Sequence, residues 1–560
     1  MLGHVVTVVI VAAVLPILGI IGKTIPEEGE PYAPPREVIA HIADGDILGT
    51  NGVTDRGTNY VAFRGIPYAQ PPVGNLRFAA PVKNSPWSGL WDATKKDANV
   101  CIQGSGESIR GSEDCLYVSV YAPKQAKDLA VLVWIYGGAF TGGDSSYDSY
   151  APDFFLDDNV VYVSFNYRLG IFGFMSTEDN VVSGNWGLKD QILALTWVRE
   201  NIARFGGDPH RVTIFGESAG GASVSYLLQI PQAQGLFDAA IVQSGNSENL
   251  WALSTRARQA AFQVGYNLGI PALLSRSLVE RLRATDAQVL QRTAASVLSQ
   301  VYILNPLRGL PWAPTIESEG PDAVFTQESD DFLQRGLFPS KVPVMIGYTS
   351  NEAGHAHGLP ENLRNYLLFF DVAGNNLAPY SLTSRGTARG RAAAEIRDHF
   401  FGPEGLSSQF NEVVKFINAD QFNRGTRRMA ENIAPFVPVY FYVFGYMGQI
   451  TGENPYDGAG HAEELFYLFK QPGEYSEKDL VVRDKLVRLW TNFAKFANPT
   501  PEREALLDNV IWPTINPQSG ILPYVWLNST ISNDVNPGQE DFTFYQDIFE
   551  RYGDGSYTTY

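Results

Sequence analysis

The stretch RVTIFGESAGGASVSYLLQ, residues 211–229, decides the fold of this chain. Val212–Phe215 predict a short buried strand, and Ala219–Gln229 predict a helix. The pentapeptide GESAG between them follows the G-x-S-x-G pattern, which holds a serine in a sharp, strained strand-to-helix turn. Small flanking residues are needed because larger side chains would clash there. The pattern predicts that Ser218 is exposed at the carboxyl end of a strand, although a glycine-rich connection with an incidental serine fits the pentapeptide equally well.

Short runs rich in β-branched and aromatic residues alternate with longer helical patterns along the chain. This alternation is typical of a largely parallel sheet. The runs are almost continuously hydrophobic, which suits strands that are covered on both faces. The predicted strands are 130–136, 160–167, 212–216, 239–245, 342–348 and 437–446.

Helical patterns lie between and after these strands. Apolar residues at helical spacing between Ile192 and Ile202 predict a helix before the GESAG strand, and residues 479–500 predict another. The stretch 250–335 is mostly helical and polar, which indicates an insertion over the sheet. Because no internal repeat or low-complexity linker interrupts the later sequence, we expect one domain over residues 44–560.

The composition excludes several classes of protein. Of the 560 residues, 44% are hydrophobic and 18% are charged, which supplies a sizeable core and argues against wholesale disorder. The formal net charge is −18 and the pI is about 4.9. An acidic surface repels nucleic acid and anionic membranes, and no basic run in the sequence reverses this locally.

The N-terminal segment is apolar. Residues 5–21 resemble the apolar region of a secretory signal peptide, although no positive segment precedes them and no clean cleavage site follows. We expect a signal peptide over residues 1–22 and a secreted protein, with an uncleaved N-terminal anchor as the alternative. Residues 23–43 predict a flexible leader.

Two further features concern the secretory pathway. Cys101 and Cys115 are the two cysteines, and an even count at short spacing in a secreted chain suggests one disulfide. Two unpaired buried thiols are the alternative. The sequon at Asn528 predicts a glycosylated surface loop if the chain is secreted.

A serine nucleophile needs a base, and the base needs a partner that fixes its tautomer. In sheets of this kind the chain order is serine, then an acid, then histidine. Of the seven histidines, His399 and His461 follow the serine with room for an acid between. His399 lies in a charged helical context that is typical of the surface, whereas His461 lies in the glycine-rich loop GAGHAEEL. The predicted base is therefore His461.

Glu352 is the predicted acid. It follows the strand 342–348, at the carboxyl end, where the active sites of open α/β sheets lie. Taken alone, Glu352 is one of many acidic loop residues. An alternative combines Glu352 with His355 and His357 in a metal site, but the sequence holds no third ligand motif and a polar lid is favoured.

Acyl transfer also needs backbone N–H donors for the oxyanion of the tetrahedral intermediate. Ala219, directly after the serine, would supply one donor. The glycine-rich segment 134–143 follows a strong strand and would supply the others, although its glycines could merely form a turn. Glycine loop, serine, acid and histidine thus occur in the order that serine hydrolysis requires.

The chain resembles the type-B carboxylesterases, a family of α/β-hydrolases that includes cholinesterases, and is most similar to insect carboxylesterases. The resemblance implies an α/β-hydrolase fold, with a largely parallel central sheet flanked by helices and a helical insertion over the active site. The matching stretches cover nearly the whole mature chain: FRGIPYAQPPVGNLRF (63–78), SEDCLYVSVYAP (112–123), VWIYGGAF (133–140), SFNYRLGIFGF (164–174), GNWGLKDQ (184–191), WVRENIARFGGDPHRVTIFGESAGG (197–221), SNEAG (350–354) and GAGHAEEL (458–465).

The resemblance also implies roles for single residues. Ser218 would be the nucleophile, His461 the general base and acid, and Glu352 the residue that orients the imidazole. The implied oxyanion donors are Gly138, Ala139 and Ala219.

Structural pairs are implied as well. Cys101 and Cys115 match the first disulfide of the family, and the implied ion pairs are Arg64 with Glu113 and Arg168 with Asp190. For Arg168 the sequence gives independent support, because an arginine inside the apolar run SFNYRLGIF needs a partner when it is buried.

The chain departs from its relatives in several places. Tyr136-Gly137-Gly138-Ala139 stands where many carboxylesterases have H-G-G-G. The methyl group of Ala139 would therefore narrow the acyl side of the active site. The loop between the cysteines lacks the tryptophan with which cholinesterases hold quaternary ammonium, so choline esters are not expected. Juvenile hormone esterases usually carry glutamine where this chain has Glu217.

These observations together predict a serine carboxylic-ester hydrolase that acts through an acyl-enzyme on small to medium apolar esters, such as pheromone, odorant, dietary, hormone or xenobiotic esters. We expect no cofactor and no metal. The expected partner is a small-molecule ester, with no nucleic acid and no membrane beyond a possible uncleaved anchor. The alternative is a catalytically silent cholinesterase-like binding or adhesion protein, but such proteins typically lose a triad residue and this chain keeps all three candidates.

Overall fold

The computed structural model describes residues 38–95, 99–304, 309–354, 371, 374–379, 382, 387–452 and 457–553. The expected signal segment lies outside the described residues, as does most of the expected leader. The last residues of that leader include a strand, β1, which pairs with the next strand of the sheet. No helix within the described ranges is long and apolar enough to cross a membrane.

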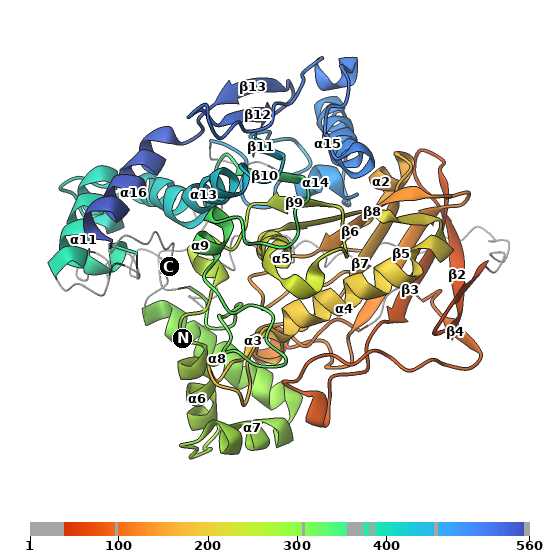
Figure 1. Ribbon diagram of the computed structural model, residues 1–560, viewed down its shortest axis with the longest axis horizontal. Helices are drawn as coiled ribbons and strands as arrows, with labels where there is room; N and C mark the ends of the chain where they lie inside the picture. The colour runs from red at the N-terminus through yellow and green to blue at the C-terminus, as the bar shows by residue number, and fades with distance from the viewer. Residues whose placement is uncertain are drawn as a thin grey trace.

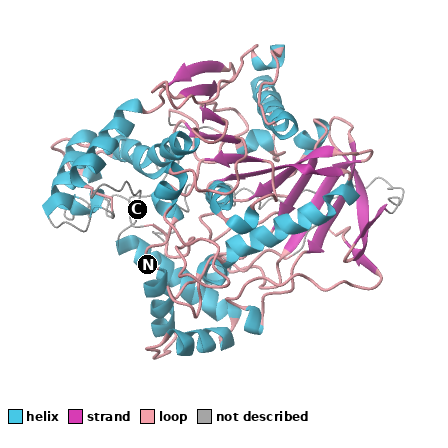
Figure 2. Cartoon of the chain, in the orientation of Figure 1, coloured by secondary structure: helices cyan, strands magenta, loops and turns pink. Residues whose placement is uncertain are grey.

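One sheet joins all the described strands, and Figure 2 shows them crossing the molecule between layers of helices. The order is β1-β2-β3-β5-β7-β6-β8-β9-β10-β11-β12-β13, with β4 paired to β2. Neighbours from β7 to β12 are parallel, whereas the strands before β7 and the final pair are antiparallel, apart from the parallel β2–β4 pair. The bounds are β1 Val38–Ile42, β2 Gly45–Val53, β3 Asn59–Pro67, β4 Leu90–Asp92, β5 Tyr117–Pro123, β6 Leu129–Ile135, β7 Val161–Phe165, β8 Gly207–Glu217, β9 Ala239–Gln243, β10 Val344–Thr349, β11 Val439–Phe444, β12 Pro523–Leu527 and β13 Ser532–Val535.

Helices cover both faces of this sheet. In Figure 1, α4 and α5 pack on one face and α2 and α15 on the other, while α6, α7 and α8 form a group at the lower end. The bounds are α2 Asp153–Asp157, α3 Gly170–Phe174, α4 Trp186–Asn201, α5 Ala219–Gln229, α6 Ala257–Asn267, α7 Ser275–Ala284, α8 Ala287–Leu304, α9 Ser329–Gln334, α11 Thr387–Phe400, α12 Phe410–Ile417, α13 Arg424–Ile433, α14 Leu465–Leu468, α15 Glu477–Phe496 and α16 Gln539–Tyr552.

The parallel part of the sheet agrees with the sequence prediction. All six predicted strands are present, as β6 to β11, and the central ones are buried along their whole length. The predicted insertion, 250–335, contains α6 to α9. The outer strands were not predicted from the sequence: β2 contains three glycines, and β13 is exposed at every position, so neither has the continuous apolar pattern of a buried strand.

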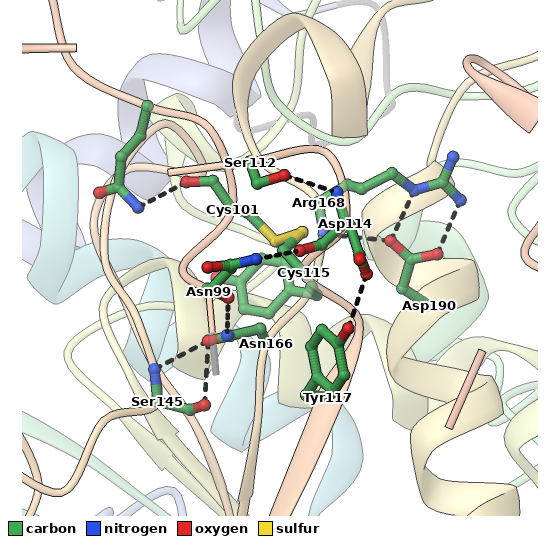
Figure 3. The surroundings of a disulfide bond; sticks show 12 residues. Asn99, Cys101, Ser112, Asp114, Cys115, Tyr117, Ser145, Asn166, Arg168 and Asp190 are labelled. Atoms are coloured by element: carbon green, nitrogen blue, oxygen red, sulfur yellow. Dashed lines mark hydrogen bonds and ion pairs between the residues drawn. A yellow bond between two sulfur atoms is a disulfide. The ribbon is translucent and has the colours of Figure 1, made fainter. Parts of the chain in front are cut away.

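Of the two implied ion pairs, one is confirmed and one is wrong. Arg168 binds Asp190 through two hydrogen bonds of 2.7 Å, and both side chains are buried beside the disulfide (Figure 3). Glu113 binds Arg77 instead of Arg64, again through two bonds, of 2.6 and 2.7 Å. Arg64 extends from β3 over the ring of Tyr147, with its guanidinium carbon 5.6 Å from the ring centroid.

Cys101 and Cys115 are joined by a disulfide, which closes a loop beside the sheet (Figure 3). The side chain of Asn166, just after β7, holds this region together: it donates to the carbonyl oxygen of Asn99 and accepts two hydrogen bonds from Ser145. The loop is therefore fixed against the carboxyl end of a central strand.

Candidate active site

Ser218 lies in a turn of one residue between β8, which ends at Glu217, and α5, which begins at Ala219. Its φ of 58° and ψ of −125° are a conformation that residues with a side chain rarely adopt. The Ser218 N–H donates to the carbonyl oxygen of Gln243 on β9 at 2.9 Å, which fixes the turn against the neighbouring strand. A Cβ atom at Gly216 would lie 2.5 Å from the backbone of Gly220, so the motif needs glycine at this position.

His461 and Glu352 are brought together from loops that follow β11 and β10. The imidazole Nδ1 lies 2.5 Å from Oε2 of Glu352. Because a carboxylate only accepts hydrogen bonds, Nδ1 donates, which leaves Nε2 as the reactive nitrogen. The other Glu352 oxygen accepts from the backbone N–H of Thr349 at 2.8 Å, so the carboxylate is fixed as well. Both side chains are buried.

Among the described residues, no hydrogen bond joins the second histidine nitrogen to the Ser218 hydroxyl. His461 Nε2 lies 3.0 Å from Oε1 of Glu217. Within the described part of the chain, the Ser218 hydroxyl has no hydrogen-bond partner. This contact was not predicted from the sequence, although Glu217 directly precedes Ser218.

The ionisable groups around His461 shift one another's pKa values. Burial lowers the pKa of His461, but the carboxylates of Glu217 and Glu352 outweigh it and raise the pKa to about 9. Burial raises the pKa of Glu217 to about 8, against the attraction of the imidazolium. Burial, together with the charge of Glu352, raises the pKa of Glu464 to about 7. His461, Glu217 and Glu464 therefore titrate at neutral to mildly alkaline pH, and the charge of each affects the pKa of the others.

A chain of hydrogen bonds connects this cluster to the far face of the sheet. Glu464 accepts from the Gln243 amide at 3.0 Å, and Gln243 in turn accepts from the indole N–H of Trp490 on α15 at 3.1 Å. The same Gln243 accepts from the Ser218 backbone. One β9 residue thus fixes both the Ser218 turn and an acidic neighbour of His461.

The other wall of the site contains a π-helical turn, Asn418–Asn423, between α12 and α13. The Phe422 ring lies 5.1 Å from the His461 ring, and Asn418 accepts a hydrogen bond from the N–H of Ala353, next to Glu352. Single π-helical turns interrupt α-helices most often at functional sites. No motif in the sequence indicated this turn.

The glycine loop after β6 lies against the nucleophile turn. Gly138 and Ala139 both have positive φ, 111° and 53°. Within the described residues, their backbone N–H groups have no hydrogen-bond partner, and the N–H of Ala219 belongs to the first turn of α5, where helical partners are lacking. Three unpaired donors are therefore available on this side of Ser218.

A cavity of about 540 Å³ adjoins this loop. One wall is apolar and comes from the insertion, through Ala294, Ala295 and Leu298 of α8 and through Trp312. Another part of the lining comes from the disulfide loop and carries Arg110, which binds Asp144. Gly138, Ala139, Glu217 and Ala462 line the inner end, so the cavity leads to the predicted catalytic residues.

The remaining predicted sites are as follows. His355 and His357 lie outside the described residues, and the described part of the chain contains no group of three or more metal-ligating side chains. His399 is partly buried in α11, where it binds Asp541 at 2.9 Å. Asn528 is half-buried, and its amide nitrogen donates to the carbonyl oxygen of Gly445.

The sheet, the strained serine turn and the histidine–acid pair define an α/β-hydrolase. The carboxylesterase family profile matches residues 36–542, and the chain belongs to this family. It is 34% identical over 527 residues to a juvenile hormone esterase of Tribolium castaneum, with 86% of each chain covered. It is also 34% identical to esterase E4 of Myzus persicae in an alignment of 500 residues, which covers 83% of this chain and 87% of the esterase.

A solved structure shows the same architecture. The juvenile hormone esterase from Manduca sexta, with OTFP covalently attached, aligns with a TM-score of 0.81 and 25% identity, over 92% of this chain and 100% of that chain. The protein is therefore a carboxylic-ester hydrolase, as the family and its esterase relatives require.

Proposed function

We propose that this esterase cleaves small to medium apolar carboxylic esters through an acyl-enzyme on Ser218. The observation that carries the proposal is the buried Glu352–His461 pair beside the strained serine turn. The unpaired N–H groups of Gly138, Ala139 and Ala219 support it, because they are the donors that an oxyanion at this serine needs.

In the proposed reaction, Ser218 Oγ attacks the ester carbonyl carbon and its proton passes to His461 Nε2. The carbonyl oxygen becomes an oxyanion that accepts from the three N–H groups. The intermediate then expels the alcohol, which takes the proton from Nε2. Water repeats the sequence on the acyl-enzyme, releases the acid and restores Ser218. In the structure Nε2 lies 3.0 Å from Glu217 Oε1, and no hydrogen bond joins it to Ser218 Oγ. Catalytic hydrogen bonds of this kind often form only in the complex with substrate.

The cavity supports the substrate class. Apart from Gln291, the residues of α8 that line the cavity are alkyl, and Trp312 adds aromatic surface. The volume of the cavity suits a ligand of drug-like size. An apolar acyl or alcohol chain against Leu298 and Trp312 would exclude water from the reacting carbonyl. We therefore propose apolar esters of the pheromone, odorant, dietary, hormone or xenobiotic classes as substrates.

Secretion is part of the same proposal. A disulfide persists in oxidising compartments, and the apolar segment 5–21 would direct the chain there. Glycosylation at Asn528 would follow, and peptide mapping of the secreted protein tests both the N-terminus and the glycan.

Hydrolysis of a p-nitrophenyl ester series of increasing chain length tests the activity. The parent enzyme should release p-nitrophenol in a burst that is followed by steady turnover. The Ser218→Ala variant should fold like the parent but show neither the burst nor the turnover. Ser223→Ala, at a second buried serine in α5, is the matched control and should keep the activity. A folded parent protein that hydrolyses none of the esters would overturn the proposal in favour of a binding protein.

A further inference from the structure

The corner between α6 and α7 carries three large apolar side chains that face solvent. Tyr266, Leu273 and Leu274 are 77%, 93% and 72% exposed, more than any other large hydrophobic side chain in the described ranges. Figure 1 shows this corner at the lower end of the molecule, where α6 and α7 project from the body. Clustered apolar exposure of this kind marks an interaction surface, whereas isolated exposed residues need no explanation.

The corner is a built structure. The Ile270 N–H donates to the carbonyl oxygen of Gly265 at 2.9 Å, and Gly269 adopts a φ of +70°, so α6 ends in a Schellman motif. Gly265 packs directly on Leu278 of α7, and a side chain at this glycine would collide with it. Leu274 precedes Leu278 by one helical turn. The exposed leucines are therefore held on a fixed framework.

The far end of α7 is fixed as well. Arg77, which binds Glu113, also donates to the carbonyl oxygens of Leu282 and Thr285. These bonds tie the end of α7 to the disulfide loop, so the corner cannot fold back to bury its leucines without breaking them.

The helices that carry the apolar corner are rich in arginine. Residues 257–304, which form α6 to α8, contain five arginines against one glutamate and one aspartate, a local charge of +3 in a chain of −18. Arg276 and Arg281 on α7 and Arg292 on α8 are exposed and form no ion pair with the described residues. These arginines are spread along the sequence, so they form no basic run.

We propose that this corner docks the protein on an anionic lipid surface. Leu273 and Leu274 insert among the acyl chains, while Arg276 and Arg281 bind phosphate groups of the lipid. Leucine beside arginine is the composition of interfacial anchors. A stable protein partner would need roughly 800 Å² of complementary surface, which a projecting corner with three apolar side chains does not supply.

The net negative charge of the chain does not oppose this docking strongly. At physiological ionic strength the screening length is about 8 Å, so carboxylates on distant faces contribute little to the field at the corner. The proposal revises the expectation that the acidic surface keeps the protein away from anionic membranes. It also gives the corner a use, because α8 packs against α6 and lines the cavity, so the cavity wall and the proposed lipid contact belong to one group of helices.

Vesicle cosedimentation of the full-length secreted protein tests the proposal. The vesicles are phosphatidylcholine alone or with roughly one third phosphatidylserine, and each arginine should contribute about fivefold to partitioning onto the anionic ones. The variant Leu273→Ser/Leu274→Ser should lose binding, and Arg276→Gln/Arg281→Gln should bind roughly twentyfold more weakly, with less dependence on salt. Val535→Ser, at an exposed apolar residue on β13, is the matched control and should bind like the parent.

Hydrolysis of a short, water-soluble ester reports on the fold of each variant and should not change, because these residues lie outside the catalytic site. Absence of parent binding to anionic vesicles at low salt would overturn the proposal. Equal binding to neutral vesicles, unaffected by the arginine substitutions, would overturn it too. A dimer in gel filtration that the double serine variant dissolves would identify a second copy of this chain as the occupant instead.

Discussion

Replacement of Glu217 by glutamine tests the electrostatics of the site most directly. The side chains are nearly isosteric, so Glu217→Gln removes a carboxylate 3.0 Å from His461 Nε2 and leaves a polar group in its place. Among the groups that raise the pKa of His461, Glu217 is the largest. The general base must be neutral, and a histidine with a pKa of about 9 is protonated at pH 7 in all but about one molecule in a hundred.

The expected shift follows from this pair. Since the pKa of Glu217 is itself about 8, the two groups titrate jointly and the carboxylate is only partly ionised near neutrality. We therefore expect the acidic limb of kcat/KM to move to lower pH by about one unit, which is an interaction of about 1.4 kcal/mol. At pH values below this limb, kcat/KM of the variant should be about tenfold higher than that of the parent. Its plateau at high pH should be lower, because the imidazolium formed in the reaction loses a neighbouring charge.

The assay is kcat/KM for a p-nitrophenyl ester across the neutral and alkaline range, read at the isosbestic wavelength of the phenol. Glu463→Gln is the matched control: Glu463 is also buried next to the His461 loop, accepts from the N–H of Gly460, and is absent from the groups that shift His461. A limb for Glu217→Gln that stays in place, or moves to higher pH, would refute the reasoning.

Three further outcomes are expected. Gly220→Ala places a methyl group against the carbonyl oxygen of Ile135, so we expect a loss of about 3 kcal/mol or failure to fold, and parent-like thermal unfolding would contradict this. Cys101→Ser/Cys115→Ser opens a loop that joins residues 14 positions apart, and the free energy of unfolding measured by chemical denaturation should fall by about 3 kcal/mol. An unchanged denaturation midpoint would show that packing alone holds the loop. The carboxyl of Glu248 is buried without a hydrogen bond to the described residues, and burial raises its pKa well above the usual 4.5. Above pH 4.5 the unfolded state therefore releases a proton that the folded state keeps, so the free energy of unfolding falls as the pH rises from 4.5 toward the raised pKa of the folded state. Glu248→Gln lacks this proton, so its melting temperature should increase relative to that of the parent as the pH rises. A difference in melting temperature that does not depend on pH would argue against this.

The sequence predicted the centre of the fold well and its edges poorly. The central strands are buried on both faces, so their continuous hydrophobic runs reflect their environment directly. The outer strands are partly exposed, and their pairing depends on neighbours far away in sequence, such as β3 with β5. The error at Glu113 has the same origin: both arginines precede it in the chain, and only the packing of the loop against α7 decides that Arg77 reaches it.

The identities of the site residues could also be predicted, because each belongs to a local motif. Their mutual arrangement could not. The contact of Glu217 with His461 depends on how the loop after β11 approaches the end of β8, and the π-helical turn that supports it carries no sequence signal. Glu464 was not predicted as a neighbour of the base, although it lies three residues after His461, because nothing local shows which side of the loop faces inward.

The carboxyl groups around His461 act in opposite directions on two stages of the proposed reaction. Before attack, Glu217 and Glu352 favour the imidazolium and so disfavour the neutral base that Ser218 needs. After attack, the same carboxylates stabilise the imidazolium beside the oxyanion. This stabilisation lowers the barrier only if it is stronger in the transition state than in the resting enzyme. Glu217 meets this condition. Its pKa of about 8 lies close to that of His461, and the two charges attract, so protonation of Glu217 is favoured when the base is neutral and ionisation is favoured when the base is charged. The pair then stays near zero net charge throughout the cycle, which avoids the cost of an isolated buried ion at either stage.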